Sequence, residues 1–537
     1  MTAAATTATT PTAPPRRSRL PSPRKAQQSL RRQARRLTDE IMAEGAQRTQ
    51  ELTAALALTQ ATLTDAELAA WRDDLQQRVA TILQHPEQHL GFVEEALARA
   101  AQEPLRLLAQ RAAQLKANTT PCQCTDCQRE LIHQRLLSRT IHSRFGPLRF
   151  WRRYGWCPAC ESWHFPADYA LGLAKKAPAS PYLQEISALL TTKMPPDQAV
   201  AVAQRFGVNL SRCTLHREAH RQGLKAQEAR AAALAQLDSW EDFTALARAT
   251  EGPPAQPFTL VIEIDAWNIR ERDHWGQTDT LRAQGEKLDR WHWVYMGTVF
   301  RLDHRGHTAG DRPVISQRGY VATRGGLEAL TRQLHYEAIQ RGLGQAQQVL
   351  VIADGAVWIW NLVADRFPEA RQRLDLWHAD QHLWEVAHDL YGRDTPEARQ
   401  WVAPLLAALR DDQPTQIIQT LEALQPRLQQ ALQDKVRTQI EYWKNNENRL
   451  HYRAIMTARK AVKAGTATSE QTRLANEPLG SGAIEATCRQ YQCRFKRTGQ
   501  FWTTAGDEAL MCLETFWRND RWHQLFPHAA PPSLARN

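Results

Sequence analysis

Residues 347–380 contain a strand–helix–strand pattern, which restricts the fold of this chain more than any other stretch. The pattern opens with four apolar residues from Val349 onward, typical of a strand buried on both faces in a parallel sheet. Asp354 follows that strand, an amphipathic helix comes next, and a proline ends the helix. A second short strand is expected to carry residues 374–378. The pattern predicts an α/β sheet with a carboxylate at the end of a strand, where such sheets usually place their chemistry.

Three further strands precede this stretch. Strands are expected at residues 258–265, 293–300 and 319–321, and a helix at residues 327–343. The first of these strands is expected to end in Asp265. The resulting order of three strands, a helix, a strand, a helix and a strand is that of an α/β RNase H-like core with a mixed five-stranded sheet. In that fold the first and fourth strands are neighbours, so Asp265 and Asp354 are expected to lie side by side.

Two adjacent aspartates repel each other unless a cation lies between them. Mg²⁺, or Mn²⁺ in its place, is the expected ion, because such hard cations take carboxylate and phosphate oxygens as ligands. Two ions of this kind can activate an attacking oxygen and stabilise a leaving one. Glu485 is the candidate for a third carboxylate, since it lies early in a helix that follows a Gly-rich turn. Taken alone, Glu485 is explained more simply as a solvated acid on a helix. The two aspartates favour the other interpretation, in which Asp265, Asp354 and Glu485 form a triad of carboxylates.

Two Cys-x-x-Cys pairs predict a metal site in the first third of the chain. Their cysteines are Cys124, Cys127, Cys157 and Cys160. Four thiolates on two such turns suit a structural, tetrahedral Zn²⁺, and the residues between the pairs look like the hairpin of a zinc ribbon. Cys122 leaves the ligand set open, because it can replace Cys124, and His164 is a weaker candidate from outside the pairs. Unligated thiols are the alternative interpretation.

Residues 176–225 predict a helix–turn–helix. Gly207 lies in the expected turn, where it supplies a positive φ, and Ser211 is expected to cap the second helix. The side chains that this helix would present to the major groove of DNA are Arg212, His216 and Arg217. An ordinary helical hairpin explains the same pattern without DNA.

The chain of 537 residues carries a formal net charge of +11, with a sequence pI of about 9.3. A basic balance fits a polyanionic partner, most often nucleic acid, but composition alone is weak evidence. Residues 1–36 are rich in Ala, Thr, Pro and Arg, and we expect a disordered basic arm that either contacts phosphates or is simply solvated. No stretch has the apolar length of a membrane span or a signal peptide, so we expect a cytoplasmic, nucleoid-associated protein.

Composition and periodicity divide the chain into regions. They are the disordered basic arm (1–36), a helical N-terminal region (37–118), the zinc ribbon (119–175), the helix–turn–helix (176–225), a helical linker (226–257), the first part of the RNase H-like core (258–384), an all-α insertion (385–476), and the last part of the core with a C-terminal tail (477–537). The insertion separates the helix that carries Glu485 from the expected sheet.

At these motifs the sequence resembles the DDE transposases of bacterial insertion sequences, specifically the ISKra type, which is related to the ISLre-type and Mutator-like enzymes. The matching stretches are the Cys-rich ribbon, IEIDAW, VIADGAVWIW, LDLWHAD and LGSGAIEATCRQYQCRFKRTGQFW. The resemblance implies that Asp265, Asp354 and Glu485 are catalytic. It also implies that Asp375 and His378 support the site. The basic residues of the last stretch are candidates for DNA contacts: Arg489, Arg494, Lys496 and Arg497.

This resemblance implies an enzyme that binds the ends of a mobile element, hydrolyses a phosphodiester with the help of metal ions, and joins the freed 3′-hydroxyl to target DNA. DNA is the expected partner, and a homo-oligomer, a dimer, is the expected state. Ala266 and Trp267 depart from the family pattern after the first aspartate, but the departure removes no carboxylate. The alternatives are a domesticated DNA-binding protein without catalysis and an RNase H-type nuclease that cuts without joining.

Overall fold

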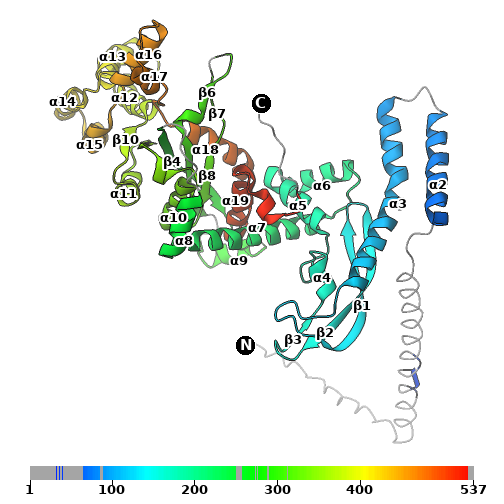
Figure 1. Ribbon diagram of the computed structural model, residues 1–537. Coiled ribbons are helices and arrows are strands. Elements are labelled where there is room, and N and C mark those ends of the chain that lie inside the picture. The colour runs from blue at the N-terminus through cyan, green and yellow to red at the C-terminus, as the bar shows by residue number, and fades with distance from the viewer. Residues whose placement is uncertain are drawn as a thin grey trace, which may run out of the picture. The chain divides into compact units, whose positions relative to one another are not determined.

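The computed structural model describes residues 65–84, 89–249, 257–272, 274, 276–286, 290–310 and 312–529, and the isolated positions 32, 35, 36 and 39 (Figure 1). The basic arm expected at residues 1–36 therefore lies almost entirely outside the described residues. The chain divides into two compact units: unit 1 contains Met1–Ile141 and Pro147–Lys176, and unit 2 contains His142–Gly146 and Ala177–Asn537. Among the described residues, no helix has the length and apolar character needed to cross a membrane.

Unit 1 combines two long helices with a three-stranded sheet. Its elements are α2 (Asp65–Leu83), α3 (Leu90–Thr119), β1 (Ile132–Ser143), β2 (Gly146–Cys157), β3 (Ser162–His164) and α4 (Pro166–Ala170), and the sheet has the order β1-β2-β3. A small core joins α3 to the hairpin, with Ala113 packed in the same cluster as Phe150. Asp168 is buried in α4 and forms ion pairs of 2.6 Å with Arg139 and Arg152. These pairs hold the short helix against both long strands.

Helices open unit 2. They are α5 (Pro181–Lys193), α6 (Pro196–Arg205), α7 (Arg212–Ala235) and α8 (Trp240–Ala249). As expected, the Ser211 side chain caps α7 by accepting a backbone N–H at 3.1 Å, and Gly207 has a φ of +76° in the turn before it. Leu183 of α5, Ala203 of α6 and Leu210 of the turn share one small core. The two helices and the turn expected from the sequence are therefore present.

A mixed five-stranded sheet forms the centre of unit 2. Its strands are β4 (Thr259–Glu271), β5 (Arg290–Arg301), β8 (Gly319–Thr323), β9 (Gln348–Ala353) and β10 (Arg371–Leu374), in the order β10-β9-β4-β5-β8. Strand β5 is antiparallel to β4 and β8, whereas β9 runs parallel to β4 and β10. The expected pairing of the first and fourth strands is confirmed, as is the mixed α/β class. Shorter elements are α9 (Thr278–Ala283) and the ribbon of β6 (Arg305–His307) with β7 (Pro313–Ile315).

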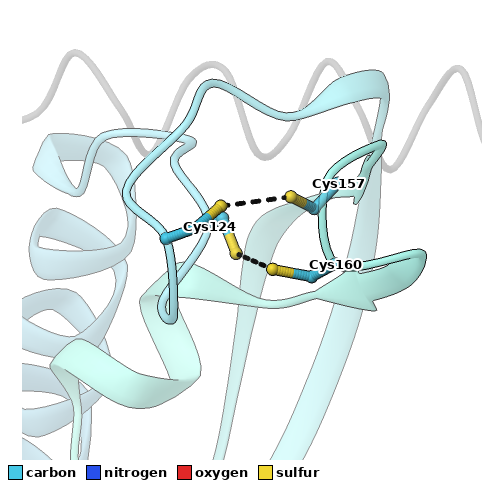
Figure 2. Close-up of side chains that lie close together, drawn as sticks. Cys124, Cys157 and Cys160 are labelled. Atoms are coloured by element: carbon cyan, nitrogen blue, oxygen red, sulfur yellow. Dashed lines mark hydrogen bonds between the residues drawn. The ribbon is translucent and has the colours of Figure 1, made fainter.

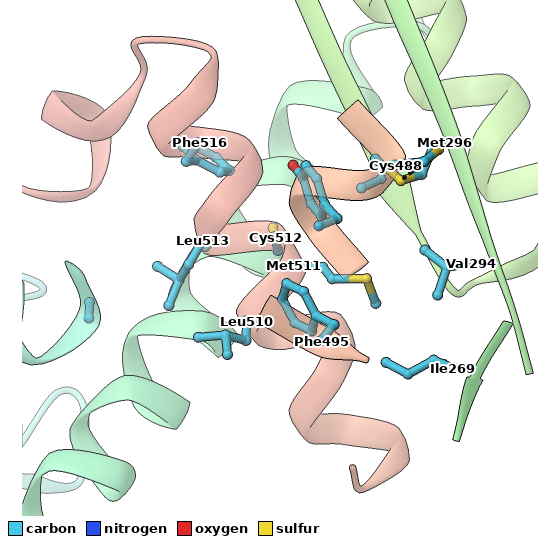
Figure 3. Close-up of a cluster of buried hydrophobic side chains, with 14 of the residues drawn as sticks. Ile269, Val294, Met296, Cys488, Phe495, Leu510, Met511, Cys512, Leu513 and Phe516 are labelled. Atoms are coloured by element: carbon cyan, nitrogen blue, oxygen red, sulfur yellow. Dashed lines mark hydrogen bonds between the residues drawn. The ribbon is translucent and has the colours of Figure 1, made fainter. Parts of the chain in front are cut away.

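Helices cover both faces of this sheet (Figure 1). They are α10 (Gly326–Gln340) and α11 (Val357–Arg366) on one face, and α18 (Gly482–Phe495), α19 (Thr504–Arg518) and the short α20 (Trp522–Leu525) on the other. Ile264 of β4 belongs to the first core and Trp267 to the second. Figure 3 shows the second core, where Phe495 of α18 lies beside Met511 of α19. Because strand side chains alternate, Asp265 lies on the α18 side of β4.

A run of helices separates β10 from α18. They are α12 (Leu376–Tyr391), α13 (Pro396–Arg410), α14 (Pro414–Leu424), α15 (Gln430–Asn446), α16 (Arg453–Lys463) and α17 (Ser469–Ala475), and they lie together beyond β10 in Figure 1. Helices α12 to α15 share a core that contains Leu383 and Trp443. The prediction of a strand over residues 374–378 is wrong, because β10 ends at Leu374 and the Asp375 side chain caps α12.

Gly223 lies where α7 packs against α19, and it supplies a stability test. A Cβ at this position would be 2.7 Å from Ala509 Cβ and 3.0 Å from the Ala509 carbonyl oxygen. Alanine normally favours a helix over glycine by about 1 kcal/mol, but this overlap reverses the preference. We expect Gly223→Ala to lower the free energy of unfolding by about 1–3 kcal/mol, measured by urea denaturation with tryptophan fluorescence. Gly344→Ala, which meets no atom within 4 Å, is the control. An unchanged or higher midpoint for Gly223→Ala would contradict the packing.

Candidate functional site

Asp265 on β4 and Asp354 directly after β9 lie at the same level of the sheet. The last parallel pair between β4 and β9 joins Glu263 to Ile352, and each aspartate follows two residues later. Each carboxylate accepts a hydrogen bond from a backbone N–H of its own segment, at 2.6 Å for Asp265 and 3.0 Å for Asp354. Burial raises the pKa of Asp265, and the negative charge of Asp354 raises it further. The two aspartates are therefore neighbours in space.

Asp265 does not lie at the end of its strand, which corrects the sequence-based expectation. Strand β4 continues to Glu271, because β5 remains paired with it up to that residue. What ends near Asp265 is the pairing with β9, whose last partner on β4 is Glu263. The Asp265 carboxylate therefore lies where the five-stranded sheet narrows, and a short way beyond it only β4 and β5 of this sheet remain paired among the described residues.

Glu485 and His378 form a cluster with Asp375. The Nδ1 atom of His378 lies 3.7 Å from a Glu485 carboxylate oxygen and 3.4 Å from an Asp375 oxygen. Ligand atoms of the three residues all lie within 4.8 Å of one another. The Asp375 carboxylate raises the pKa of His378 to about 9, and the charges of Asp354 and Glu485 act in the same direction. The imidazole is therefore cationic at neutral pH and acts as a counter-ion to these acids.

Asp375 holds the parts of this cluster in place. Its buried carboxylate accepts hydrogen bonds from the N–H groups of Trp377 and His378, at 2.6 and 2.8 Å. Ser481 donates to the same carboxylate through its hydroxyl at 2.7 Å and through its backbone N–H. Gly480 leaves no room for a side chain here, because a Cβ would lie 2.8 Å from Asp375 Oδ2. With four donors on two oxygens, Asp375 is better suited to positioning its neighbours than to binding a metal.

Glu263 is a buried acid that was not among the candidates from the sequence. It precedes Asp265 by two residues on the same face of β4, and only 1% of its surface is exposed. Its Oε2 accepts a hydrogen bond from the backbone N–H of Ile484 at 2.8 Å. Burial raises the pKa of Glu263 to about 8. The alternation of side chains along the strand could have identified Glu263, because it places Glu263 on the same face as Asp265. The hydrogen bond from Ile484 shows that Glu263 anchors the first turn of α18 to the sheet.

The helical insertion also reaches the site, through α15. The Tyr442 hydroxyl donates to the backbone carbonyl of Asp354 at 3.0 Å, and Asn446 donates to the carbonyl of Gly355 at 3.5 Å. Gly355 has a φ of +97°, and a Cβ there would lie 2.7 Å from the Tyr442 ring. No local sequence pattern marks Tyr442 or Asn446, since only tertiary packing brings them to Asp354.

The basic residues expected to contact DNA differ in exposure. Those exposed near the start of α7 are Arg212, His216 and Arg217, and those exposed in or after α18 are Arg489, Lys496 and Arg497. Arg494 is buried, and its guanidinium donates to the Thr191 carbonyl at 2.7 and 3.1 Å. Burial lowers the pKa of Arg494 to about 10. The assignment of Arg494 to DNA binding is therefore corrected: it ties the end of α18 to the last turn of α5.

The four cysteines of the Cys-x-x-Cys pairs converge in unit 1 (Figure 2). Their sulfurs all lie within 4.8 Å of one another, with 3.5 Å between Cys127 and Cys157 and 3.8 Å between Cys124 and Cys160. The Asp126 N–H donates to Cys124 Sγ at 3.4 Å, which favours a thiolate there. Four sulfurs at such distances can hold a zinc ion in a tetrahedral site.

Cys124 rather than Cys122 belongs to this group. Cys122 packs beside the cluster but is not one of the converging ligands found among the described residues. His164 is close as well, with Nε2 at 3.5 Å from Cys124 Sγ, and forms an alternative group with Cys124, Asp126 and Cys160. The geometry thus favours Cys124 in the choice that the sequence left open.

No protein-family model matches this sequence, and no curated protein matches it.

The cysteine geometry predicts the metal content of single variants. We expect the purified protein to carry about one zinc ion per chain and Cys124→Ser to lose most of it, because a serine hydroxyl is a poor substitute for a thiolate ligand. Cys122→Ser is the matched control and should keep its zinc. Inductively coupled plasma mass spectrometry of protein dialysed against metal-free buffer measures both. Equal losses from the two variants would contradict the assignment of Cys124.

Proposed function

We propose that this protein is a DDE-type DNA transposase of a bacterial insertion sequence. The observation that carries the proposal is geometric: Asp265 and Asp354 each follow the last β4–β9 pair by two residues, and a Glu485 carboxylate oxygen lies 3.7 Å from Nδ1 of His378. Two of the acids lie at the same level, one on β4 and one directly after the parallel strand β9, and the third lies in the first turn of α18. This is the arrangement that the resemblance to DDE transposases implies for a catalytic triad.

We assign an RNase H-like fold to the sheet and its covering helices. The strand order β10-β9-β4-β5-β8 supports this assignment, because three antiparallel strands are followed by two parallel ones with the fourth next to the first. Helix α18 then takes the place of the last core helix, after the helical insertion. The insertion contributes Tyr442 and Asn446 to the segment that carries Asp354.

Mg²⁺ or Mn²⁺ is the cofactor that we propose for the triad. The chemistry of the proposed ligands supports such an ion, because all three are carboxylates and hard divalent cations prefer oxygen. Asp265, Asp354 and Glu485 would hold it, with Asp375 fixing the position of His378 nearby. When bound, such ions lower the pKa of an attacking water and stabilise the oxygen that leaves.

The proposed reaction has two phosphoryl transfers at one site. In the first, water attacks the phosphorus at the element end, the bond from phosphorus to the 3′-oxygen breaks, and a 3′-hydroxyl is freed. In the second, that hydroxyl attacks a phosphodiester of target DNA, forms a new bond, and releases the target's own 3′-hydroxyl. The cationic His378 is suited to pairing with a phosphate oxygen or to balancing the acids between these steps.

DNA binding is assigned to several basic surfaces. Helices α6 and α7 would act as a helix–turn–helix, with the exposed Arg212, His216 and Arg217 directed to the major groove. The exposed Arg489, Lys496 and Arg497 would contact phosphates near the triad, and the four converging cysteines would form a zinc ribbon. We propose a homodimer that acts in the nucleoid, because two element ends must be held together for joining.

The triad is tested with DNA that carries the sequences flanking the coding gene. We expect Asp265→Ala, Asp354→Ala and Glu485→Ala to lower cleavage and strand transfer in Mg²⁺ by at least about a hundredfold, since each removes a carboxylate that orients the reacting phosphate. Asp303→Ala is the control, because Asp303 is an exposed acid that pairs with Arg301 at 2.5 Å outside this cluster. Rates are measured on end-labelled DNA in sequencing gels.

Each alternative function gives its own result in this assay. Activity of the triad variants at the wild-type level would rule out the proposed catalytic site. Cleavage without a joined product would indicate a nuclease, and sequence-specific binding without cleavage in either Mg²⁺ or Mn²⁺ would indicate a non-catalytic DNA-binding protein.

A further inference from the structure

Strands β4 and β5 extend beyond the five-stranded sheet as a two-stranded ribbon. Among the described residues, β9 pairs with β4 only as far as Glu263, and β8 pairs with β5 only from Tyr295 onward. The two strands nevertheless remain paired with each other as far as Glu271 and Arg290. The ribbon therefore starts beside Asp265 and leads away from the triad.

The segment after α18 fixes the outer edge of this ribbon. The Arg272 N–H donates to the Trp502 carbonyl at 2.7 Å, and the Trp502 N–H donates to the Arg270 carbonyl at 3.3 Å. This pairing brings Phe501 and the end of α18 next to β4. The ribbon is thus held in position by a segment that lies outside the sheet.

Two large tryptophans lie exposed on one face of the ribbon. Trp291 is 57% exposed and Trp293 is 52% exposed, and they alternate with the half-buried His292. Their cross-strand partners on the same face are Arg270 and Asn268, both polar. Burying such side chains would be favourable by itself, so an exposed pair of them marks a surface that binds something.

Positively charged groups lie beside two of the aromatic rings at this face, Trp291 and Phe501. The Arg270 guanidinium lies 5.8 Å from the Trp291 ring centre and 4.8 Å from that of Phe501, and Lys496 Nζ lies 5.8 Å from Trp291. Among the described residues of β4 and β5 beyond Asp265, the acid is Glu271, which is buried on the opposite face and forms an ion pair with Arg324. The exposed face therefore combines aromatic rings with cations.

We propose that this face, the ribbon platform of Trp291, Trp293, Arg270, Phe501 and Lys496, binds an unpaired DNA strand. Bases would stack on the indoles, and phosphates would pair with the cations. Residues two apart on a strand are about 6.8 Å apart, which is twice the spacing of about 3.4 Å between nucleotides of one DNA strand. Two indoles held parallel at this spacing would accommodate one planar base between them.

The position of the platform specifies the substrate. Asn268, the partner of Trp293, follows Asp265 by three residues on β4, which corresponds to about 10 Å along the strand. Alternation places the two side chains on opposite faces, so a bound DNA strand would pass around the ribbon edge and span at least about three nucleotides. The inference rests on the proposed function and deepens it: the preferred substrate is a DNA end whose strands are opened within a few nucleotides of the reacting phosphate.

The platform is tested by fluorescence anisotropy with a fluorescein-labelled oligo(dT) of about 20 nucleotides, which is long enough for one single-strand site. The full chain is used, and no divalent cation is added. We expect Trp291→Leu/Trp293→Leu to raise the Kd at least about tenfold, because leucine keeps apolar bulk on the strand but has no aromatic face. Trp291→Phe/Trp293→Phe should recover most of the affinity. Trp240→Leu is the control, because Trp240 is 81% exposed on α8, a helix that packs against α10.

Two results would contradict the proposal that the platform binds an unpaired DNA strand. One is a wild-type chain that does not bind the oligonucleotide, and the other is an unchanged Kd for the double leucine variant. A double leucine variant that loses a dimer in light scattering while its Kd stays constant would show that the face serves self-association instead. An inactive triad with oligonucleotide binding that still depends on the tryptophans would remove the proposed catalysis but leave the platform in place.

Discussion

The buried carboxylate of Asp375 is the interaction on which the arrangement of the candidate site depends. It accepts hydrogen bonds from the first turn of α12 and from Ser481, just before α18. Hydrogen bonds to an ionised group are roughly twice as strong as neutral ones, and here they join segments on either side of the whole helical insertion. The same carboxylate orients His378, so one buried charge fixes both the approach of α18 to the sheet and the cation that faces the acids.

The sheet and the insertion contribute to the site in different ways. Parallel pairing of β4 and β9 sets Asp265 and Asp354 at one level, because their register is fixed at Glu263 and Ile352. The insertion then contacts the backbone after β9 through Tyr442, whose hydroxyl donates to the Asp354 carbonyl. A helical insertion that touches the end of such a strand is part of the site and more than a peripheral addition.

The sequence predicted what local patterns determine and missed what packing determines. The pairing of the first and fourth strands, the cap at Ser211 and the four converging cysteines were predicted from the order of the elements, a hydrogen-bonding side chain and the spacing of the cysteines. The burial of Arg494 could not be predicted, because an arginine near a helix end is usually solvated and only the position of α5 provides the Thr191 carbonyl. The exposure of Trp291 could not be predicted either, since apolar residues on strands normally face a core.

The helical insertion also orders events in time during synthesis. Asp265 and Asp354 leave the ribosome before Glu485, and at typical elongation rates the residues between 354 and 485 take on the order of ten seconds to appear. Helices α12 to α15 share their own core, so this part of the chain has the contacts to fold while the nascent chain still lacks α18. The third carboxylate is thus added last, and the proposed triad cannot be complete on a nascent chain until translation has passed the insertion.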